Sequence, residues 1–228
     1  MSAVEPVLSS SGLSLDEAIK ARHSSRRFLS TPIPQHLVTT ALELAQLSPS
    51  NSNIQPWHLV VVTGPRLHRL KAALHAVAST STPNIPALPE SFTHFRSELG
   101  LQVYGVGMGI GREDHEARRE AVLRNYQFFG APVIGILCMD KRLGAVDALG
   151  VGMYLQTLLL ALTEVGLGSC VEVSVAGYPE VLRSELGIDD GLEILCGVAM
   201  GFEDKDFGAN KLKIARRPIE ENVVFLEE

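Results

Sequence analysis

Two clusters of basic side chains stand out in a chain whose overall charge is acidic. The first basic cluster, residues 20–27, and the second basic cluster, residues 211–217, each hold four cations and no acid. These cations are Lys20, Arg22, Arg26 and Arg27, and Lys211, Lys213, Arg216 and Arg217. Arginine forks suit phosphate oxygens, and Ser24 adds a hydroxyl donor to the first cluster. The clusters indicate either two solvated faces or one shared anion site.

A run of small polar residues precedes an apolar, β-branched segment. Residues 48–57 read Ser-Pro-Ser-Asn-Ser-Asn-Ile-Gln-Pro-Trp, and a plain turn needs fewer side-chain amides than this run carries. Amides both donate and accept hydrogen bonds. The run therefore suits a heterocycle with alternating donors and acceptors, such as the pyrimidine ring of a flavin.

Most standard catalytic signatures are missing from the sequence. Residues 105–111 alternate Gly with other residues, but a dinucleotide loop needs Gly where Ile110 or Arg112 stands, so we interpret this segment as a flexible loop. The sequence has no Walker loop, no His-Glu-x-x-His and no Gly-x-Ser-x-Gly elbow. The seven histidines are scattered and predict no metal site. The three cysteines, Cys138, Cys170 and Cys196, are interpreted as small buried hydrophobic residues.

Length and composition are typical of one folded domain. The chain has 228 residues, of which 46% are hydrophobic and 20% charged, which argues against a disordered tail or a coiled-coil rod. Its formal net charge of −6 argues against a dedicated nucleic-acid binder. The first dozen residues carry no secretory signal pattern, so we expect a cytoplasmic protein without a membrane partner.

Strands and helices are expected to alternate along the chain. Apolar runs predict strands at 57–63, 132–139, 169–175 and 192–200. Helical spacing predicts helices at 14–22, 34–47, 67–77, 113–126, 146–165 and 179–186, the second with an apolar stripe of Leu37, Ala41, Leu44 and Leu47. Residues 79–89, with three prolines, predict a loop. This order favours an α/β or α+β sheet between helices.

The most apolar helix could be mistaken for a membrane span. Residues 149–167 contain Gln156, Thr157, Thr163 and Glu164, which favours a buried helix of a soluble protein instead. It is too hydrophobic to cover only one sheet face, so we expect it also to pack against a second subunit.

Three segments carry a resemblance to a known family. Residues 22–28, residues 48–58 and residues 210–221 resemble the nitroreductase family of FMN-dependent flavoproteins, from about residue 13 to residue 226. Residues 108–132 and 152–157 are similar to the branch that includes nitrobenzoate reductases. The resemblance implies an α+β fold, a mixed β-sheet sandwiched by helices, in an intertwined homodimer with FMN at the subunit interface. It also implies one domain over residues 13–228, with residues 1–12 as a flexible N-terminus and 203–228 as a C-terminal arm.

The resemblance assigns cofactor-binding roles to individual residues. Arg22, Ser24 and Arg216 would hold the FMN phosphate, His23 would contact the cofactor through its backbone or ring, and Arg26 would lie near N1 and O2 of the flavin. Residues reaching the flavin from the other subunit would be Pro49, Ser50, Asn51 and Asn53, with Gln55 beside them. Val171, Glu172 and Val173 correspond to the strand at the flavin N5 edge. This sequence continues Val171-Glu172-Val173-Ser174, where the family commonly has Pro-Ile-Glu-Gly.

The resemblance also implies a reaction. NADPH or NADH would reduce the flavin, and a nitroaromatic or quinone would then take the donor's place, in ping-pong fashion. The flavin carries the hydride chemistry, so no catalytic side-chain triad is needed, and Arg26 would give electrostatic support. Candidate walls of the substrate pocket are Phe92, Phe95, Tyr104, Phe128 and Phe129, although core packing explains aromatic residues equally well. Two alternatives stay open: a flavin-fragmenting or dehalogenating enzyme of the same fold, and a non-enzymatic flavin-binding sensor.

Overall fold

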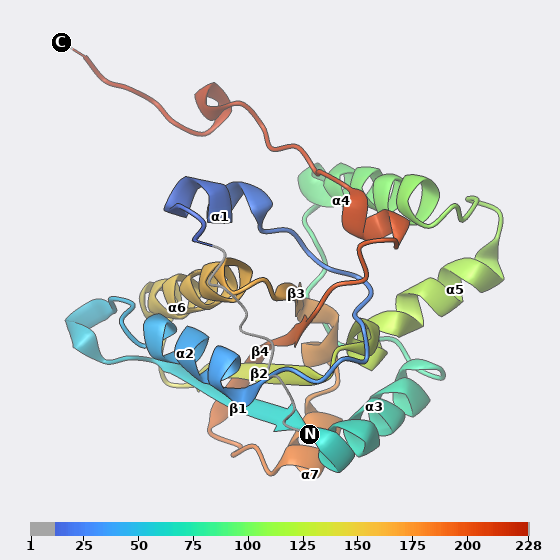
Figure 1. Cartoon of the computed structure of the whole chain (residues 1–228), viewed down its shortest axis with the longest axis horizontal. Helices are drawn as coiled ribbons and strands as arrows, with labels where there is room; N and C mark the ends of the chain where they lie inside the picture. Colours follow the sequence, from blue (N-terminus) through green and yellow to red (C-terminus); the bar gives the residue numbers. More distant parts are fainter. Residues whose placement is uncertain (1–11, 228) are drawn as a thin grey trace, which may run out of the picture.

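The computed structural model describes residues 12–227. The predicted flexible N-terminus therefore lies outside the described residues, apart from Gly12. Within them, four strands and seven α-helices form the α+β fold expected from the sequence (Figure 1).

The sheet has the strand order β1-β2-β4-β3. The strands are β1 (Trp57–Thr63), β2 (Val133–Asp140), β3 (Gly168–Glu172) and β4 (Leu192–Gly201). All three strand pairs are antiparallel, so the described strands do not form the mixed sheet that we predicted; the one parallel contact among them and their flanks is a bridge between Ser24 and Ser169. The two central strands are the most apolar, because helices cover both of their faces.

Helices cover the sheet on both sides, and two hydrophobic clusters fill the spaces between them (Figure 1). On one face lie α2 (Gln35–Ala45) and α6 (Ala145–Glu164), packed around Trp57 and Tyr154, whose rings stack with centroids 4.9 Å apart. On the other face lie α3 (Gly64–Ala78) and α7 (Pro179–Leu186), around Leu70 and Leu74. The remaining helices are α1 (Leu15–Ala21), α4 (Thr93–Gly100) and α5 (His115–Leu123).

Local sequence patterns predicted the ends of several helices and strands correctly. The capping box at Ser14 is present, with the Ser14 backbone N–H donating to Glu17 Oε2 at 2.8 Å. The predicted strand β1 and the predicted helix α7 have the observed bounds, and residues 79–89 form the expected loop. All three cysteines are buried and free.

The structure corrects four local expectations. Strand β3 ends at Glu172, because the next residues turn in a 3₁₀ helix that carries Val175 into the core. On α2, Leu44 is exposed, while Val38 and Ala45 take buried positions; Leu47 is also exposed and lies in the turn after the helix. The charged helix α5 is shorter than expected, since residues 124–130 continue as a 3₁₀ turn with Phe128 and Phe129 in left-handed conformations.

The fourth correction concerns the glycine-rich segment, which is not wholly a loop. Residues 101–107 form a π-helical turn that ends where Gly107 meets the C-terminal arm. A Cβ at Gly107 would lie 2.8 Å from the Ala209 Cα, so this glycine permits close packing of the two segments.

Helix α6 is the one helix among residues 12–227 that is long and apolar enough to cross a membrane. Its inner face is buried against the sheet through Tyr154, Leu158 and Leu162. Its outer face exposes Val146 and Leu149. The packing of the inner face identifies α6 as a core helix.

The C-terminal arm, residues 203–227 of the described chain, first crosses the body and then leaves it (Figure 1). A 3₁₀ turn at Gly208–Lys211 packs against the body, with Ala209 and Asn210 buried. Beyond it the chain is exposed and ends in Val223, Val224, Phe225 and Leu226.

Candidate functional site

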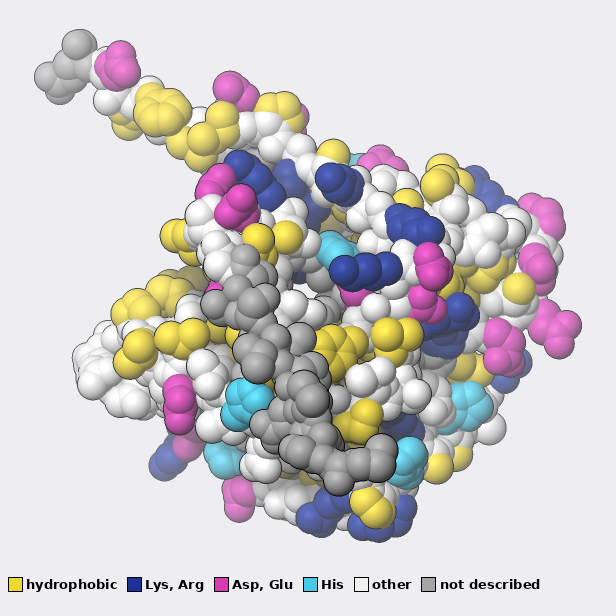
Figure 2. All heavy atoms as spheres, in the orientation of Figure 1, with side chains coloured by type: hydrophobic (Ala, Val, Ile, Leu, Met, Phe, Trp, Pro, Cys, Tyr) yellow, Lys and Arg dark blue, Asp and Glu magenta, His cyan; other side chains and the backbone are white. Residues whose placement is uncertain are grey.

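The two basic clusters meet at one cavity of about 620 Å³. Cations from both ends of the chain line it, and none of the described residues in its lining is acidic. We call it the basic cavity; its polar and charged lining is Lys20, Arg22, His23, Ser24, Arg26, Asn210, Lys211, Lys213 and Arg216. Figure 2 shows Lys and Arg side chains gathered at the base of the arm. The fold thus brings residues of both basic clusters to one cavity instead of placing them on two separate faces.

The first basic cluster is held in place by the edge of the sheet. Helix α1 ends at Ala21, and the chain then runs alongside β3, with the Ser25 N–H donating to the Ser169 carbonyl at 2.9 Å. Further along, the Leu29 N–H donates to the Phe202 carbonyl at 2.8 Å. Arg22, Ser24 and Arg26 therefore occupy one extended segment beside the sheet.

Asn210 connects the second basic cluster to the first. Its Oδ1 accepts the Arg26 backbone N–H at 2.6 Å, and its Nδ2 donates to the Arg27 and Asp204 carbonyls, each at 2.9 Å. The amide is buried and these three bonds use most of its capacity. The three hydrogen bonds of the Asn210 side chain, called the clip below, hold the backbone of Arg26 against the arm.

Arg26 is partly buried and lies in a conformation fixed by the chain itself. Its Nη1 donates to the Ser24 carbonyl at 3.1 Å. Tyr104 lies within its electrostatic reach: burial raises the pKa of the Tyr104 phenol, and the charges of Arg26 and Arg118 act in the opposite direction. A guanidinium and a phenol thus occupy one region beside the basic cavity.

The His23 ring makes contacts that its position in the sequence does not indicate. Its Nε2 lies 2.8 Å from Glu203 Oε2, and its Nδ1 lies 2.9 Å from the Ala21 carbonyl oxygen. The hydrogen bond to Glu203 raises the pKa of His23, although burial opposes it. Both ring nitrogens are therefore engaged within the protein.

Glu172 is the one described residue whose buried side-chain oxygens have no hydrogen-bond partner. It is 3% exposed at the end of β3. Burial raises its pKa well above the usual range, while the charges of Lys71 and Arg26 act in the opposite direction. Burial therefore favours the protonated form of this carboxyl.

The polar turn of residues 49–55 lies elsewhere. It packs on the start of α6, where a Cβ at Gly150 would lie 3.1 Å from Ser50 Cβ and 3.3 Å from Pro56 Cγ. Pro49, Asn51, Asn53 and Gln55 are exposed, and none of the turn lines the basic cavity.

The backbone of this turn is strained. Ser52, Asn53 and Gln55 all have left-handed φ angles, of 49°, 56° and 50°. Such conformations are costly for non-glycine residues and concentrate at functional sites. The Ser50 hydroxyl supports the turn by accepting the Gln55 N–H at 2.9 Å.

The candidate aromatic residues separate into two groups. Phe128 and Phe129 are buried in the hydrophobic core, and neither lines the basic cavity. Phe92 and Phe95 are exposed at the start of α4, with ring centroids 6.3 Å apart, and Leu99 of the same helix lines the basic cavity. The Arg217 guanidinium lies over the Phe95 ring, 5.4 Å from its centroid.

Residues 171–173, which the resemblance assigns to the flavin N5 edge, do not present their side chains on one side of the sheet. Val171 packs on the α6 side of the sheet, Glu172 is buried on the opposite side, and Val173 is exposed where β3 has ended.

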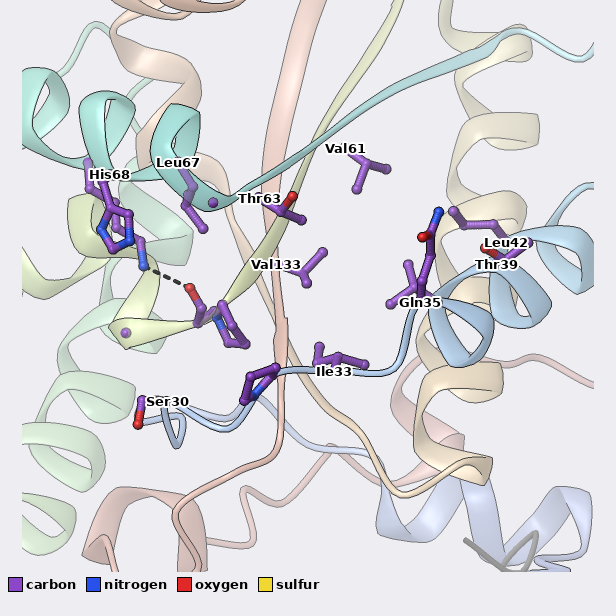
Figure 3. A pocket seen from close by; sticks show the side chains of 17 residues that line it. Ser30, Ile33, Gln35, Thr39, Leu42, Val61, Thr63, Leu67, His68 and Val133 are labelled. Atoms are coloured by element: carbon purple, nitrogen blue, oxygen red, sulfur yellow. Dashed lines mark hydrogen bonds between the residues drawn. The ribbon is translucent and has the colours of Figure 1, made fainter. Parts of the chain in front are cut away.

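A larger cavity of about 850 Å³ lies between α2 and α3, beside the edge strand β1 (Figure 3). Its lining contains none of the residues predicted for the cofactor site. Lys71 points toward it and donates to the Ala131 carbonyl at 2.7 Å, drawn as the dashed line in Figure 3. Size alone therefore does not identify the functional site.

Sequence reasoning missed Glu203, and it named Asn210 only as part of a motif. Both lie about 180 residues from their partners in the first basic cluster, as the separations of 180 for His23–Glu203 and 184 for Arg26–Asn210 show. The only sequence signal was an acid directly after the last core strand, which is too common to interpret alone.

Comparison with known proteins agrees with this geometry. The sequence model of the Nitroreductase family matches residues 19–202. The chain belongs to the nitroreductase family. Its relatives include the 4-nitrobenzoate reductase of Pseudomonas putida, 34% identical over 206 residues, which are 88% of this chain and 90% of the relative.

Solved structures of this family superpose closely on the chain. The FMN and NADPH-dependent nitroreductase NfnB from Sphigopyxis sp. strain HMH has a TM-score of 0.90 and 31% identity, covering 95% of this chain and 100% of that one. The FMN-dependent nitroreductase NfnB from Mycobacterium smegmatis, in complex with NADPH, has a TM-score of 0.86 and 30% identity, covering 93% and 97%. The nitroreductase fold extends over almost the whole chain.

Proposed function

We propose that this protein is an FMN-dependent oxidoreductase that uses NADPH or NADH to reduce nitroaromatic compounds. The observation that carries the proposal is the basic cavity, where cations from both chain ends line one acid-free site in a protein with a net charge of −6. Family membership and the nitrobenzoate reductase among the relatives support the same reaction class.

The residues present fit an FMN phosphate. A phosphate dianion needs several donors, and Arg22, Ser24 and Arg216 supply two forks and a hydroxyl within the basic cavity. Lys211 and Lys213 add charge to the same lining. His23 would contribute its backbone and its charge to phosphate binding. Its ring nitrogens would not bind the phosphate directly, because they already contact the Ala21 carbonyl and Glu203.

The chain's own groups then tune the chemistry. FMN, when bound, supplies hydride transfer between NAD(P)H and an acceptor. Arg26 would offer a guanidinium to the negative charge that develops on reduction, and Glu172, whose pKa burial raises, belongs to the N5-edge segment. If donor and acceptor use one place in turn, ping-pong kinetics follow.

We propose that two chains complete each cofactor site. Within one chain the turn of residues 49–55 does not reach the basic cavity, so Pro49, Ser50, Asn51, Asn53 and Gln55 would serve the cavity of the partner. Exposed apolar side chains after α2 and on α6 support an intertwined homodimer, since Leu47 is 80% and Leu149 67% exposed.

The acceptor would bind near α4 and the π-helical turn. Phe92, Phe95 and Tyr104 remain candidate walls for a nitroaromatic, and a quinone fits the same description. A cytoplasmic location, where NADPH and NADH are supplied, suits this reaction.

The test is purification of the protein followed by an absorbance spectrum and an assay. We expect a flavin band, bleaching by NADPH, and turnover with 4-nitrobenzoate. A protein that shows no flavin band after incubation with FMN contradicts the proposal. Flavin binding and bleaching without turnover on any nitroarene or quinone would leave a flavoprotein of another activity.

A further inference from the structure

The His23 ring has an acceptor at each of its nitrogens. The Ala21 carbonyl oxygen, 2.9 Å from Nδ1, can only accept, so Nδ1 carries a hydrogen. The Glu203 carboxylate oxygen, 2.8 Å from Nε2, also accepts while it is ionised, so Nε2 carries the second hydrogen. The geometry is that of an imidazolium cation.

Glu203 is built into the sheet edge and does not move freely. Its Oε2 also accepts the Ser25 hydroxyl at 3.0 Å, and its backbone forms a bridge with Phe28. A Cβ at Gly168 would lie 2.6 Å from Ser25 Oγ and 3.2 Å from Glu203 Cβ, so only glycine leaves room for this pair. The hydrogen bond from His23 lowers the pKa of Glu203, which keeps the acid ionised.

His23 lines two neighbouring cavities, and Glu203 lines only one of them. His23 lines the basic cavity with Arg22, Ser24 and Arg26, whereas Glu203 is absent from that lining. Glu203 instead lines a neighbouring cavity of about 810 Å³, together with His23. The cation therefore stands at the phosphate site and the balancing acid stands behind it.

From this arrangement we propose that Glu203 is a positioning residue that holds His23 as an imidazolium in the wall of the basic cavity, so that binding of a phosphate dianion weakens when His23 loses its proton. The proposal rests on the proposed FMN function and adds a residue and a pH dependence to it. Other charged groups that act on the pair are Arg22, on the same segment, and Lys205, after β4. Among these groups, His23 is the side-chain type whose ordinary pKa lies nearest neutrality, and the hydrogen bond to Glu203 raises that pKa.

The experiment measures FMN retention by the full-length protein in equilibrium dialysis at about pH 7 and about pH 9. The phosphate is already mostly a dianion over this range, since its second pKa is about 6. We expect the affinity of the natural protein to fall roughly three- to tenfold, as expected for one charge lost near a partly screened dianion. Riboflavin, which lacks the phosphate, should show no such fall.

Two variants and a control identify the group responsible. His23→Gln should bind FMN more weakly at the lower pH and with little pH dependence. Glu203→Gln keeps a hydrogen-bond acceptor but removes the charge, so the NMR titration midpoint of His23 should move downward. His36→Gln, at an exposed position on α2, should behave like the natural protein.

The outcomes separate this inference from the proposed function. If no FMN binds at either pH, the proposed function fails. If FMN binds and His23→Gln keeps the full pH dependence of the natural protein, or if Glu203→Gln leaves the His23 midpoint unchanged, the role of the pair is refuted while the FMN site stands.

Discussion

Single residues in this protein act through charge placed in partly buried surroundings. Arg26 is the clearest case, since Asn210 fixes its backbone at 2.6 Å and the Ser24 carbonyl fixes its guanidinium. A positioned cation stabilises negative charge that appears only during reaction more than it stabilises the resting complex.

We therefore expect Arg26→Ala to slow reduction of the bound cofactor by NADPH more than it weakens FMN retention. A charge-assisted hydrogen bond contributes about 1.5–3 kcal/mol, or roughly ten- to a hundredfold in rate. Stopped-flow bleaching at saturating NADPH measures the rate, and Arg69→Ala, exposed on α3, is the control. An unchanged rate with weaker FMN retention would assign Arg26 to the phosphate instead.

Glu172 predicts a pH dependence of stability with a definite sign. Because its pKa is raised in the folded state, the folded chain keeps a proton that the unfolded chain loses above about pH 4.5. Stability is then lost as pH rises, by up to about 1.4 kcal/mol per pH unit, until the carboxyl titrates in the folded state.

The variant Glu172→Gln removes this titration. In denaturant titrations, the difference between the free energy of unfolding of the variant and that of the natural protein should rise from about pH 5 to about pH 7, in favour of the variant. Glu193→Gln, exposed on β4, is the matched control. Parallel pH profiles for the natural protein and Glu172→Gln would show that Glu172 is already ionised in the fold.

At the scale of elements, the C-terminal arm supplies part of the lining of the basic cavity, although its sequence resembles a polar chain end. Lys211, Lys213 and Arg216 line the basic cavity, while the adjacent Arg217 points to Phe95 and Asn222 instead. Neighbouring arginines thus offer a matched comparison.

We expect Arg216→Ala, and a chain ending after Asp206, to bind FMN at least about tenfold more weakly, as loss of a charge-assisted contact implies. Riboflavin binding should change much less for Arg216→Ala, because riboflavin has no phosphate. Arg217→Ala should retain FMN normally in the same dialysis assay. Full flavin occupancy in the truncated chain would exclude the arm from the site.

At the scale of the whole molecule, several large apolar side chains are exposed on the side of α6. Leu47, Val146 and Leu149 form part of an uncovered surface next to the turn of residues 49–55. A homodimer would bury this surface and would bring that turn to the second chain's cavity.

Sedimentation at micromolar concentration should therefore give about twice 24.7 kDa. Leu149→Glu places a charge on the uncovered face and should yield monomer that loses FMN, whereas Leu88→Glu in the loop after α3 should not. A folded, FMN-loaded monomer would contradict the two-chain site.

Local chemistry determined much of this protein directly from the sequence. The capping box at Ser14, the bounds of β1 and α7 and the burial of the three cysteines follow from spacing and propensity over a few residues. The two basic clusters are visible in the sequence as cations without acids, which left two solvated faces and one shared anion site as alternatives. The family resemblance implied the α+β class and gave Arg22, Ser24 and Arg216 their expected partner.

Tertiary structure decided what depends on residues far apart in the chain. The pairing of His23 with Glu203, the clip from Asn210 to Arg26 and the burial of Glu172 arise only when β3, β4 and the arm come together. The end of β3 and the choice of the buried face of α2 also depended on packing. Core contacts outweigh local propensity at both places. Spacing along a chain is enough to predict helices and strands. A contact between residues 180 positions apart depends on the packing of chain segments at the sheet edge, which local spacing does not contain.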